Sequence, residues 1–259
     1  MCQAIDKGRI KRTLYKYRTT EQLDMILKNM QFYFATYKEF NDPFEFSIKM
    51  SGLDEEGAKN YVDELCSKQE PWLRSIVEKC GERNSYVDIL KEAISRQTAQ
   101  MGIFCCSAVN DNILMWSHYA DGHKGCCIEF DVTEDMPFFC FPKPIVYSSK
   151  YIECELIKDG ALNIKDVIPS FFHKVPDWSY EQEYRIIKHD FNGFLKINSK
   201  AIKSIIVGCR MPENDINDIK EKLGYSRLLQ HVQLKRCVID ENEYKLNIID
   251  VPFREHCCC

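Results

Sequence analysis

The sequence predicts an α+β protein with a mixed or split β-sheet core and a helical insertion. Short aromatic and β-branched runs alternate with segments in which apolar residues recur every three or four positions, a pattern typical of strands mixed with helices. The 259 residues are 45% hydrophobic and 29% charged, a globular composition with enough apolar surface for a core. We therefore expect one α+β domain over residues 13–250, a helical insertion at about 52–101 and a C-terminal tail at 251–259.

The domain is expected to begin with a strand and a helix. Leu14–Arg18 (LYKYR) is short and aromatic, which favours a strand. Thr19 can cap the helix that follows, and this helix is expected to end near Asn29. A second strand is predicted at Phe32–Phe34, and a turn at Asn41–Pro43 within the aromatic motif FNDPFE.

The segment from about Gly52 to Met101 is predicted to be helical, because its apolar residues recur at spacings of three and four between Gly and Pro residues. Strands are then expected at Ile103–Ser107 and Cys126–Phe130, with a helix between them that Asp111 or Asn112 caps. Adjacent cysteines at the start of the second strand should point to opposite faces of the sheet.

The C-terminal part is expected to add strands, one helix and a hairpin. The helix begins at Pro212 and runs to Leu223, with Gly224 as its terminator. The predicted strands are Ile145–Tyr147, Tyr184–Lys188 and Ile202–Val207, and the closing hairpin pairs Val232–Ile239 with Tyr244–Ile249.

Composition argues against several classes of protein. The formal charge of -4 and the pI near 5.9 are the opposite of a phosphate-binding surface, so nucleic acid is not indicated as a partner. No apolar run approaches the ~18 residues of a membrane span. The 14 cysteines are diluted along the chain and no signal peptide opens it, so a reducing, cytoplasmic location is expected. Cys257–Cys259 lack a prenylation pattern and are interpreted as an exposed tail.

The segment YEQEYR carries the densest charge pattern. If it is a strand, its period of two places Glu181, Glu183 and Arg185 on one face. Two carboxylates beside a guanidinium could line a polar cleft in which one glutamate acts as a base or stabilises a developing positive charge. The alternative is a solvated strand face with a local ion pair.

Two further segments offer candidate ligand-binding groups. In NILMWSHYADGHKG, Ile113, Trp116 and Ala120 share a helix face and are expected to pack, which leaves Tyr119 and its neighbours to meet a ligand. No HExxH pattern and no CxxC pair occurs, so no metal is expected. Arg18 ends the first strand, where it could present a bidentate cation to phosphate or ribose or lie at the surface.

The motifs LYKYR, FNDPFE, LMWSHYADGHKGCCIEFD, YEQEYRII and IIVG occur in this order between residues 14 and 208. With them the chain resembles an uncharacterised bacterial family that is catalogued as a domain of unknown function. More distantly it is similar to ADP-ribosyltransferases, which have an arginine on the first strand, an aromatic or hydroxyl residue after a middle strand, and a late Glu-x-Glu strand. Such enzymes bind NAD in a cleft between two small sheets.

This second resemblance implies an NAD-consuming transferase or glycohydrolase of toxin or defence type, with a protein as one acceptor class. Glu183 would be the catalytic carboxylate that stabilises an oxocarbenium-like transition state, and Glu181 would orient the acceptor nucleophile. Arg18 would contact the phosphate or the adenosine ribose. The implied cofactor-binding residues are Arg18, Tyr17, Ser107, Tyr119 and Trp116.

A non-catalytic protein-binding or regulatory module is the alternative function. Aromatic residues are dense in FNDPFE and MWSHYA and, if exposed, could form a recognition surface. This alternative predicts an apolar patch without a converging polar cluster.

Overall fold

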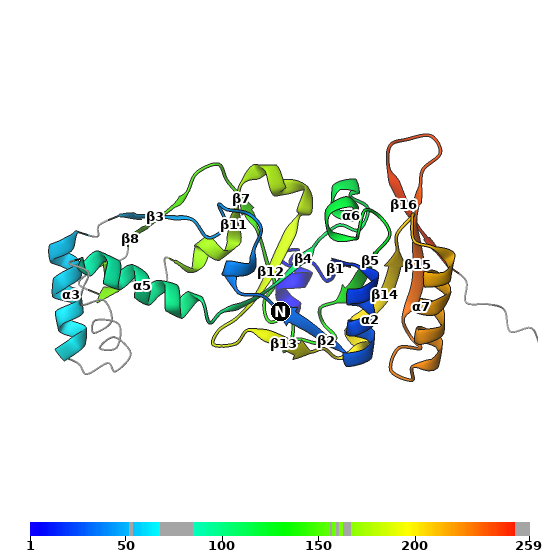
Figure 1. Ribbon diagram of the computed structural model, residues 1–259, viewed down its shortest axis with the longest axis horizontal. Helices are drawn as coiled ribbons and strands as arrows, with labels where there is room; N and C mark the ends of the chain where they lie inside the picture. Colours follow the sequence, from blue (N-terminus) through cyan, green and yellow to red (C-terminus); the bar gives the residue numbers. More distant parts are fainter. Residues whose placement is uncertain (52–53, 68–84, 156, 159–160, 163–166, 252–259) are drawn as a thin grey trace, which may run out of the picture.

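The computed structural model describes the chain except residues 52–53, 68–84, 156, 159–160, 163–166 and 252–259. Within the described residues, an eight-stranded mixed sheet has the order β16-β15-β14-β5-β1-β4-β12-β6 (Figure 1). Neighbouring strands are antiparallel except for β14 and β15, which are parallel. The strands are β1 (Thr13–Arg18), β4 (Gly102–Ser107), β5 (Cys126–Asp131), β6 (Lys143–Pro144), β12 (Glu183–Lys188), β14 (Ile202–Val207), β15 (Gln233–Ile239) and β16 (Leu246–Asp250).

Helices and short strand pairs surround this sheet. The α-helices are α1 (Cys2–Asp6), α2 (Thr20–Asn29), α3 (Glu55–Ser67), α5 (Tyr86–Thr98), α6 (Ile113–Tyr119) and α7 (Glu213–Tyr225), and the 3₁₀ helices are η1 (Tyr37–Glu39), η3 (Ile168–Phe172), η4 (Pro176–Glu181) and η5 (Ser199–Ala201). The strand pairs are β2 (Gln31–Phe34) with β13 (Gly193–Lys196), β3 (Ile48–Ser51) with β8 (Ile152–Glu155), β7 (Val146–Tyr147) with β11 (His173–Lys174), and β9 (Ile157–Lys158) with β10 (Ala161–Leu162). The fold class is α+β, as predicted.

The element predictions are confirmed where the local signals were strong. Thr19 caps α2 in a capping box with Gln22, and α2 ends at Asn29 as expected. Asn112 caps α6 by accepting hydrogen bonds from two backbone N–H groups. The prediction that Gly224 terminates its helix is wrong, because α7 continues through it to Tyr225.

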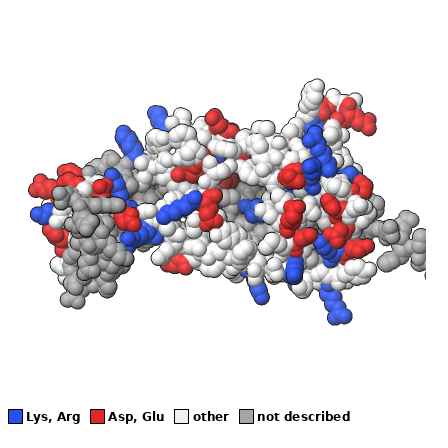
Figure 2. Space-filling view, viewed as in Figure 1, with Lys and Arg blue, Asp and Glu red and all other residues white. Residues whose placement is uncertain are grey.

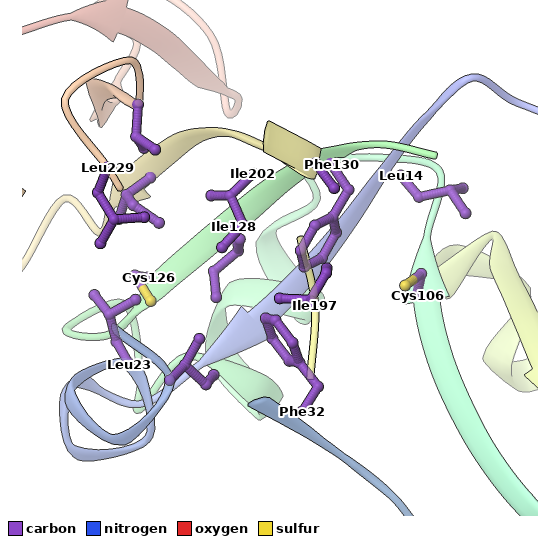
Figure 3. Close-up of a cluster of buried hydrophobic side chains, with 14 of the residues drawn as sticks. Leu14, Leu23, Phe32, Cys106, Cys126, Ile128, Phe130, Ile197, Ile202 and Leu229 are labelled. Atoms are coloured by element: carbon purple, nitrogen blue, oxygen red, sulfur yellow. The ribbon is translucent and has the colours of Figure 1, made fainter. Parts of the chain in front are cut away.

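Apolar side chains pack on both faces of the sheet. On one face, Ile128 and Phe130 of β5 pack with Leu23 of α2 and Phe32 of β2 (Figure 3). Trp116 of α6 lies in a second cluster, which covers the other face. Cys126 belongs to the first cluster and Cys127 to the second, so these adjacent cysteines point to opposite faces as predicted.

The sheet is split between β1 and β4. Strand β1 pairs with β5 along its whole length, from Thr13 to Arg18, but it pairs with β4 only at Tyr15 and Ser107. The two strands therefore diverge beyond this pair, and the ladder between them is interrupted. This split gives the sheet a hollow in its middle, which is where the candidate site lies.

The helices of the predicted insertion, α3 and α5, pack on each other at one end of the molecule (Figure 1). Residues 52–53 and 68–84 of that segment lie outside the described residues, as does the predicted tail from residue 252 onward, including Cys257–Cys259. Among the helices that are described, none has both the length and the apolar composition to cross a membrane.

We expect opposite effects from alanine at two glycines. A Cβ atom at Gly208 would lie 2.0 Å from the backbone carbonyl oxygen of His123, whereas a Cβ atom at Gly224 would meet nothing within 4 Å. Gly208→Ala should therefore lower the free energy of unfolding by about 1–3 kcal/mol through overpacking. Gly224→Ala should raise it by about 0.4–1 kcal/mol, because alanine restricts the unfolded chain and favours the helix. Urea denaturation measures both, and equal effects would contradict the close approach at Gly208.

Candidate functional site

A cavity of about 130 Å³ lies at the split between β1 and β4. Its walls come from both strands, from α6, from the FNDPFE segment and from the β11–β12 region. Every residue of the site predicted from sequence lines this cavity except Trp116. The lining residues are Tyr15, Lys16, Tyr17, Arg18, Phe40, Asn41, Cys105, Cys106, Ser107, Met115, Tyr119, Lys174, Glu181 and Glu183.

Glu183 opens strand β12, opposite Ser107 of β4. Two residues further along the same strand face, Arg185 donates to its carboxylate from Nε at 2.7 Å and from Nη2 at 3.1 Å. Arg185 is 0% exposed and Glu183 is 5% exposed. The prediction that the two share a face is confirmed, and the alternative of a solvated strand face is wrong.

Glu181 reaches the same cavity by a different route from the one predicted. It is not on the strand but at the end of η4, and Gln182, with φ at 43°, turns the chain between them. The strand period therefore does not apply to Glu181. Its carboxylate accepts a hydrogen bond from the hydroxyl of Tyr119 at 2.6 Å and one from Lys174 Nζ at 2.7 Å.

Sequence reasoning missed two charged residues that complete this group. Lys174 Nζ lies 3.3 Å from Glu183 Oε2 and 3.5 Å from Glu45 Oε1, and Arg185 Nη2 donates to Glu45 Oε1 at 2.6 Å. We call Glu45, Lys174, Glu181, Glu183 and Arg185 the buried charge cluster. Lys174 had no sequence signal, whereas Glu45 belongs to the FNDPFE motif, which had been interpreted only as a turn between aromatic residues.

The two glutamates of the motif have opposite pKa shifts. Burial alone would raise the pKa of Glu183, but Arg185 and then Lys174 outweigh burial and hold this pKa at about 2. Burial and the nearby charge of Glu183 raise the pKa of Glu181, although Lys174 and Tyr119 act against the shift. Glu183 is therefore firmly ionised at neutral pH, and Glu181 takes up a proton more readily.

The opposite wall carries two cations from β1. Lys16 Nζ donates to the carbonyl of Cys105, and Arg18 Nη1 donates to the carbonyl of Tyr17 at 3.1 Å. Burial, with Arg18 second, lowers the pKa of Lys16 to about 8, and burial also lowers the pKa of Arg18. In the described part of the chain, neither cation forms a salt bridge, so this wall offers uncompensated positive charge to an anion.

Ser107 and Tyr17 line the cavity, but their hydroxyl groups donate hydrogen bonds to the protein backbone. Ser107 Oγ donates to the carbonyl of Glu181 at 2.6 Å, which ties η4 to the end of β4. The Tyr17 hydroxyl donates to the carbonyl of Val109 at 2.9 Å. Both residues therefore shape the walls of the cavity, and Ser107 also holds the backbone of Glu181 in place.

Trp116 does not reach the cavity. It is 0% exposed, its ring lies edge-on to Tyr17 at 5.3 Å, and its Nε1 donates to the carbonyl of Asn110 at 2.8 Å. The assignment of Trp116 to cofactor binding is therefore wrong, because its helix face packs into the core. Ile113 was expected to pack beside it but is 44% exposed, since it lies in the first turn of α6.

The segment that holds Tyr119, Lys174, Glu181, Glu183 and Arg185 has a counterpart among known protein families. Residues 115–186 match DUF2971, a protein of unknown function. The DUF2971 match supports an uncharacterised domain family, and it extends from α6 into β12, leaving β1 and the FNDPFE segment outside. No curated protein and no solved structure matches the chain.

The aromatic surface that the binding-module alternative requires does not form as predicted. Trp116 is in the core, and Phe40 and Phe46 stack on the guanidinium of Arg185 at 5.2 and 5.3 Å from their ring centroids. Phe44 is 54% exposed. Among the described residues, Phe40, Phe46 and Trp116 are therefore packed in the protein and not free to form the recognition surface that this alternative proposed.

Charge on the face of the molecule shown in Figure 2 is mixed. Acidic and basic side chains are interspersed over the face in Figure 2 instead of gathering into one basic patch. Within the described residues, no group of three or more His, Cys, Asp and Glu side chains is arranged to hold a metal ion.

Proposed function

We propose that the protein cleaves NAD at the bond between nicotinamide and ribose, as an ADP-ribosyltransferase or an NAD glycohydrolase. One observation carries the proposal: the adjacent strands β1, β4 and β12 bring Arg18 and Glu183 to one cavity at the split of the sheet. A ligand in this cavity would meet both a cation that has no salt bridge and an ionised carboxylate. NAD needs both, since its phosphates are anionic and its ribose becomes cationic as nicotinamide leaves.

Glu183 would act on the reacting ribose. When the glycosidic bond breaks, its electron pair leaves with nicotinamide and a positive charge develops on the ribose ring. A fixed carboxylate in a site that excludes water stabilises such a charge far more than it would in bulk solvent. The low pKa of Glu183 supplies that fixed charge, because Arg185 and Lys174 hold the carboxylate ionised.

Glu181 would serve the second half of the reaction. Its pKa is raised, and so lies nearer to neutral pH than that of Glu183. A pKa nearer to the working pH suits a general base that takes a proton from the attacking group. Water as the attacking group yields free ADP-ribose, and a nucleophilic protein side chain yields a modified protein. Tyr119 and Lys174 would orient the Glu181 carboxylate through their hydrogen bonds to its two oxygens.

Arg18 and Lys16 would bind the phosphates. A guanidinium without a carboxylate partner is free to form bidentate hydrogen bonds with phosphate oxygens. The cavity of about 130 Å³ is smaller than the 300–1,000 Å³ typical of sites for larger ligands. It therefore suits one end of a dinucleotide, and the rest of the molecule would extend past Arg18.

The test is release of nicotinamide from NAD by the purified protein, alone and with cell lysate as a source of acceptors. Glu183→Gln should reduce release by at least about 100-fold, because it removes the charge that stabilises the transition state. Glu213→Gln is the matched control: this glutamate is 65% exposed on α7 and should leave release unchanged. All proteins are assayed at a temperature where circular dichroism shows that they are folded.

Arg18→Gln is a second variant that leaves the buried charge cluster intact. It should raise the KM for NAD more than it lowers kcat, because the phosphates are bound in both the ground state and the transition state. The proposal is overturned if wild-type protein releases no nicotinamide in either condition, or if folded Glu183→Gln releases it at the wild-type rate.

A further inference from the structure

Arg18 lines a second cavity as well as the first. This one measures about 340 Å³ and lies beside α2, β2 and β13, elements that Figure 1 shows next to one another. Its size falls within the 300–1,000 Å³ range of small-molecule sites. Its lining residues are Arg18, Gln22, Met25, Ile26, Asn29, Gln31, Phe32, Tyr33 and Phe194.

Exposed apolar side chains converge on this second cavity. Met25, Tyr33 and Phe194 are 57%, 38% and 59% exposed. The rings of Tyr33 and Phe194, from paired strands, lie 5.1 Å apart at 55° to each other. Apolar side chains that gather at the surface around a concavity are a feature of ligand sites. Such rings offer π-faces on which a flat heterocycle can stack.

Polar groups complete the chemistry of a nucleoside site. Gln22, Asn29 and Gln31 line the same cavity, and their amide groups can donate to and accept from the edge of a base. Gln22 also accepts a hydrogen bond from the backbone of Thr19 at 3.2 Å, which fixes its side chain. Arg18 adds the only cation that lines this cavity in the described part of the chain.

We propose that this second cavity binds the adenosine half of NAD, with Arg18 holding the phosphates at the junction of the two cavities. The inference rests on the proposed function for the identity of the ligand. In NAD the phosphates join two nucleosides, so a phosphate bound by a residue that both cavities share sends one nucleoside into each. The first cavity contains the carboxylates that would act on the nicotinamide ribose, so adenine is assigned to the second cavity.

The test is calorimetric titration of the full-length protein with AMP and with adenosine, neither of which contains the bond to be cleaved. Phe194→Ala should weaken binding of both at least about 5-fold, since it removes a stacking surface. Phe141→Ala is the matched control: Phe141 is also 59% exposed, it does not line either cavity, and its replacement should leave binding unchanged. Melting temperatures establish that both variants are folded.

Arg18→Gln distinguishes the contribution of the adenine base to binding from that of the phosphate. It should weaken AMP binding but leave adenosine binding unchanged, and it should remove most of the salt dependence of AMP binding. The inference is overturned if wild-type protein binds neither compound at millimolar concentration, or if Phe194→Ala binds both as well as the wild type does. A different result would show that only the proposed cleavage of NAD is wrong. In that case the protein would bind AMP in a way that depends on Phe194, but it would release no nicotinamide from NAD.

Discussion

Arg185→Met is expected to lower the free energy of unfolding by about 3–5 kcal/mol, the usual cost of removing one partner from a buried ion pair. The Arg185 side chain is completely buried and donates to Glu183, to Glu45 and to the carbonyl of Phe171. Without it, Lys174 alone would face three buried carboxylates, and methionine can satisfy none of the groups that lose a donor. Urea denaturation at pH 7 measures the difference.

Arg96→Met is the matched control for this substitution. Arg96 pairs with Glu92 at 3.0 Å on the surface of α5, where the two side chains are 42% and 39% exposed. A surface pair of this i,i+4 kind contributes about 0.3–0.5 kcal/mol. If Arg185→Met destabilised the protein no more than Arg96→Met does, the buried charge cluster would not be a determinant of stability.

The elements whose signals are local in sequence were predictable. The capping of α2 by Thr19 and the strand Ile202–Val207 depend on residues within a few positions of each other, and both match the structure. The course of α7 through Gly224 was not predictable, because a helix that packs on the core can pass a glycine at a cost of about 1 kcal/mol.

Six of the predicted site residues line the cavity, but within the buried charge cluster only contacts between residues of one motif were predictable. Glu183 and Arg185 are two positions apart on a strand, so the period of two placed them together. Glu45 is 140 positions from Arg185, and no pattern along the chain reports a contact at that separation. The periodicity of its helix correctly predicted that Trp116 packs in the core, whereas its cofactor-binding role was implied only by the resemblance to ADP-ribosyltransferases.

The charges of the site do not balance within the cluster. Glu45, Glu181 and Glu183 oppose Lys174 and Arg185, which leaves one negative charge in excess when all are ionised. Burying an unpaired charge is costly, and a protein avoids this by shifting a pKa. Burial, together with the nearby charge of Glu183, raises the pKa of Glu181, so the two glutamates of one short motif differ in the protonation state that the fold favours.

Glu183→Gln and Glu181→Gln are therefore expected to change stability in opposite directions at pH 7. The folded state lowers the pKa of Glu183 to about 2, so it favours the ionised form, and a neutral glutamine should cost about 3 kcal/mol. The folded state raises the pKa of Glu181, so it favours the neutral form, and glutamine should raise the melting temperature. Urea denaturation and thermal melting of the two variants measure these effects.

The pH dependence follows from the same two shifts. The stability that Glu183 contributes is complete above its ordinary pKa of about 4.3 and is lost as the pH falls toward 2, so the deficit of Glu183→Gln should shrink in that window. The stability that protonated Glu181 contributes is complete below about pH 4.3 and is lost as the pH rises through its raised pKa. The higher stability of Glu181→Gln relative to the wild type should therefore appear only above about pH 4.3.

Equal losses of stability in both variants at pH 7 would mean that the cluster holds both carboxylates ionised. Glu181 would then be too weak a base for the role proposed for it.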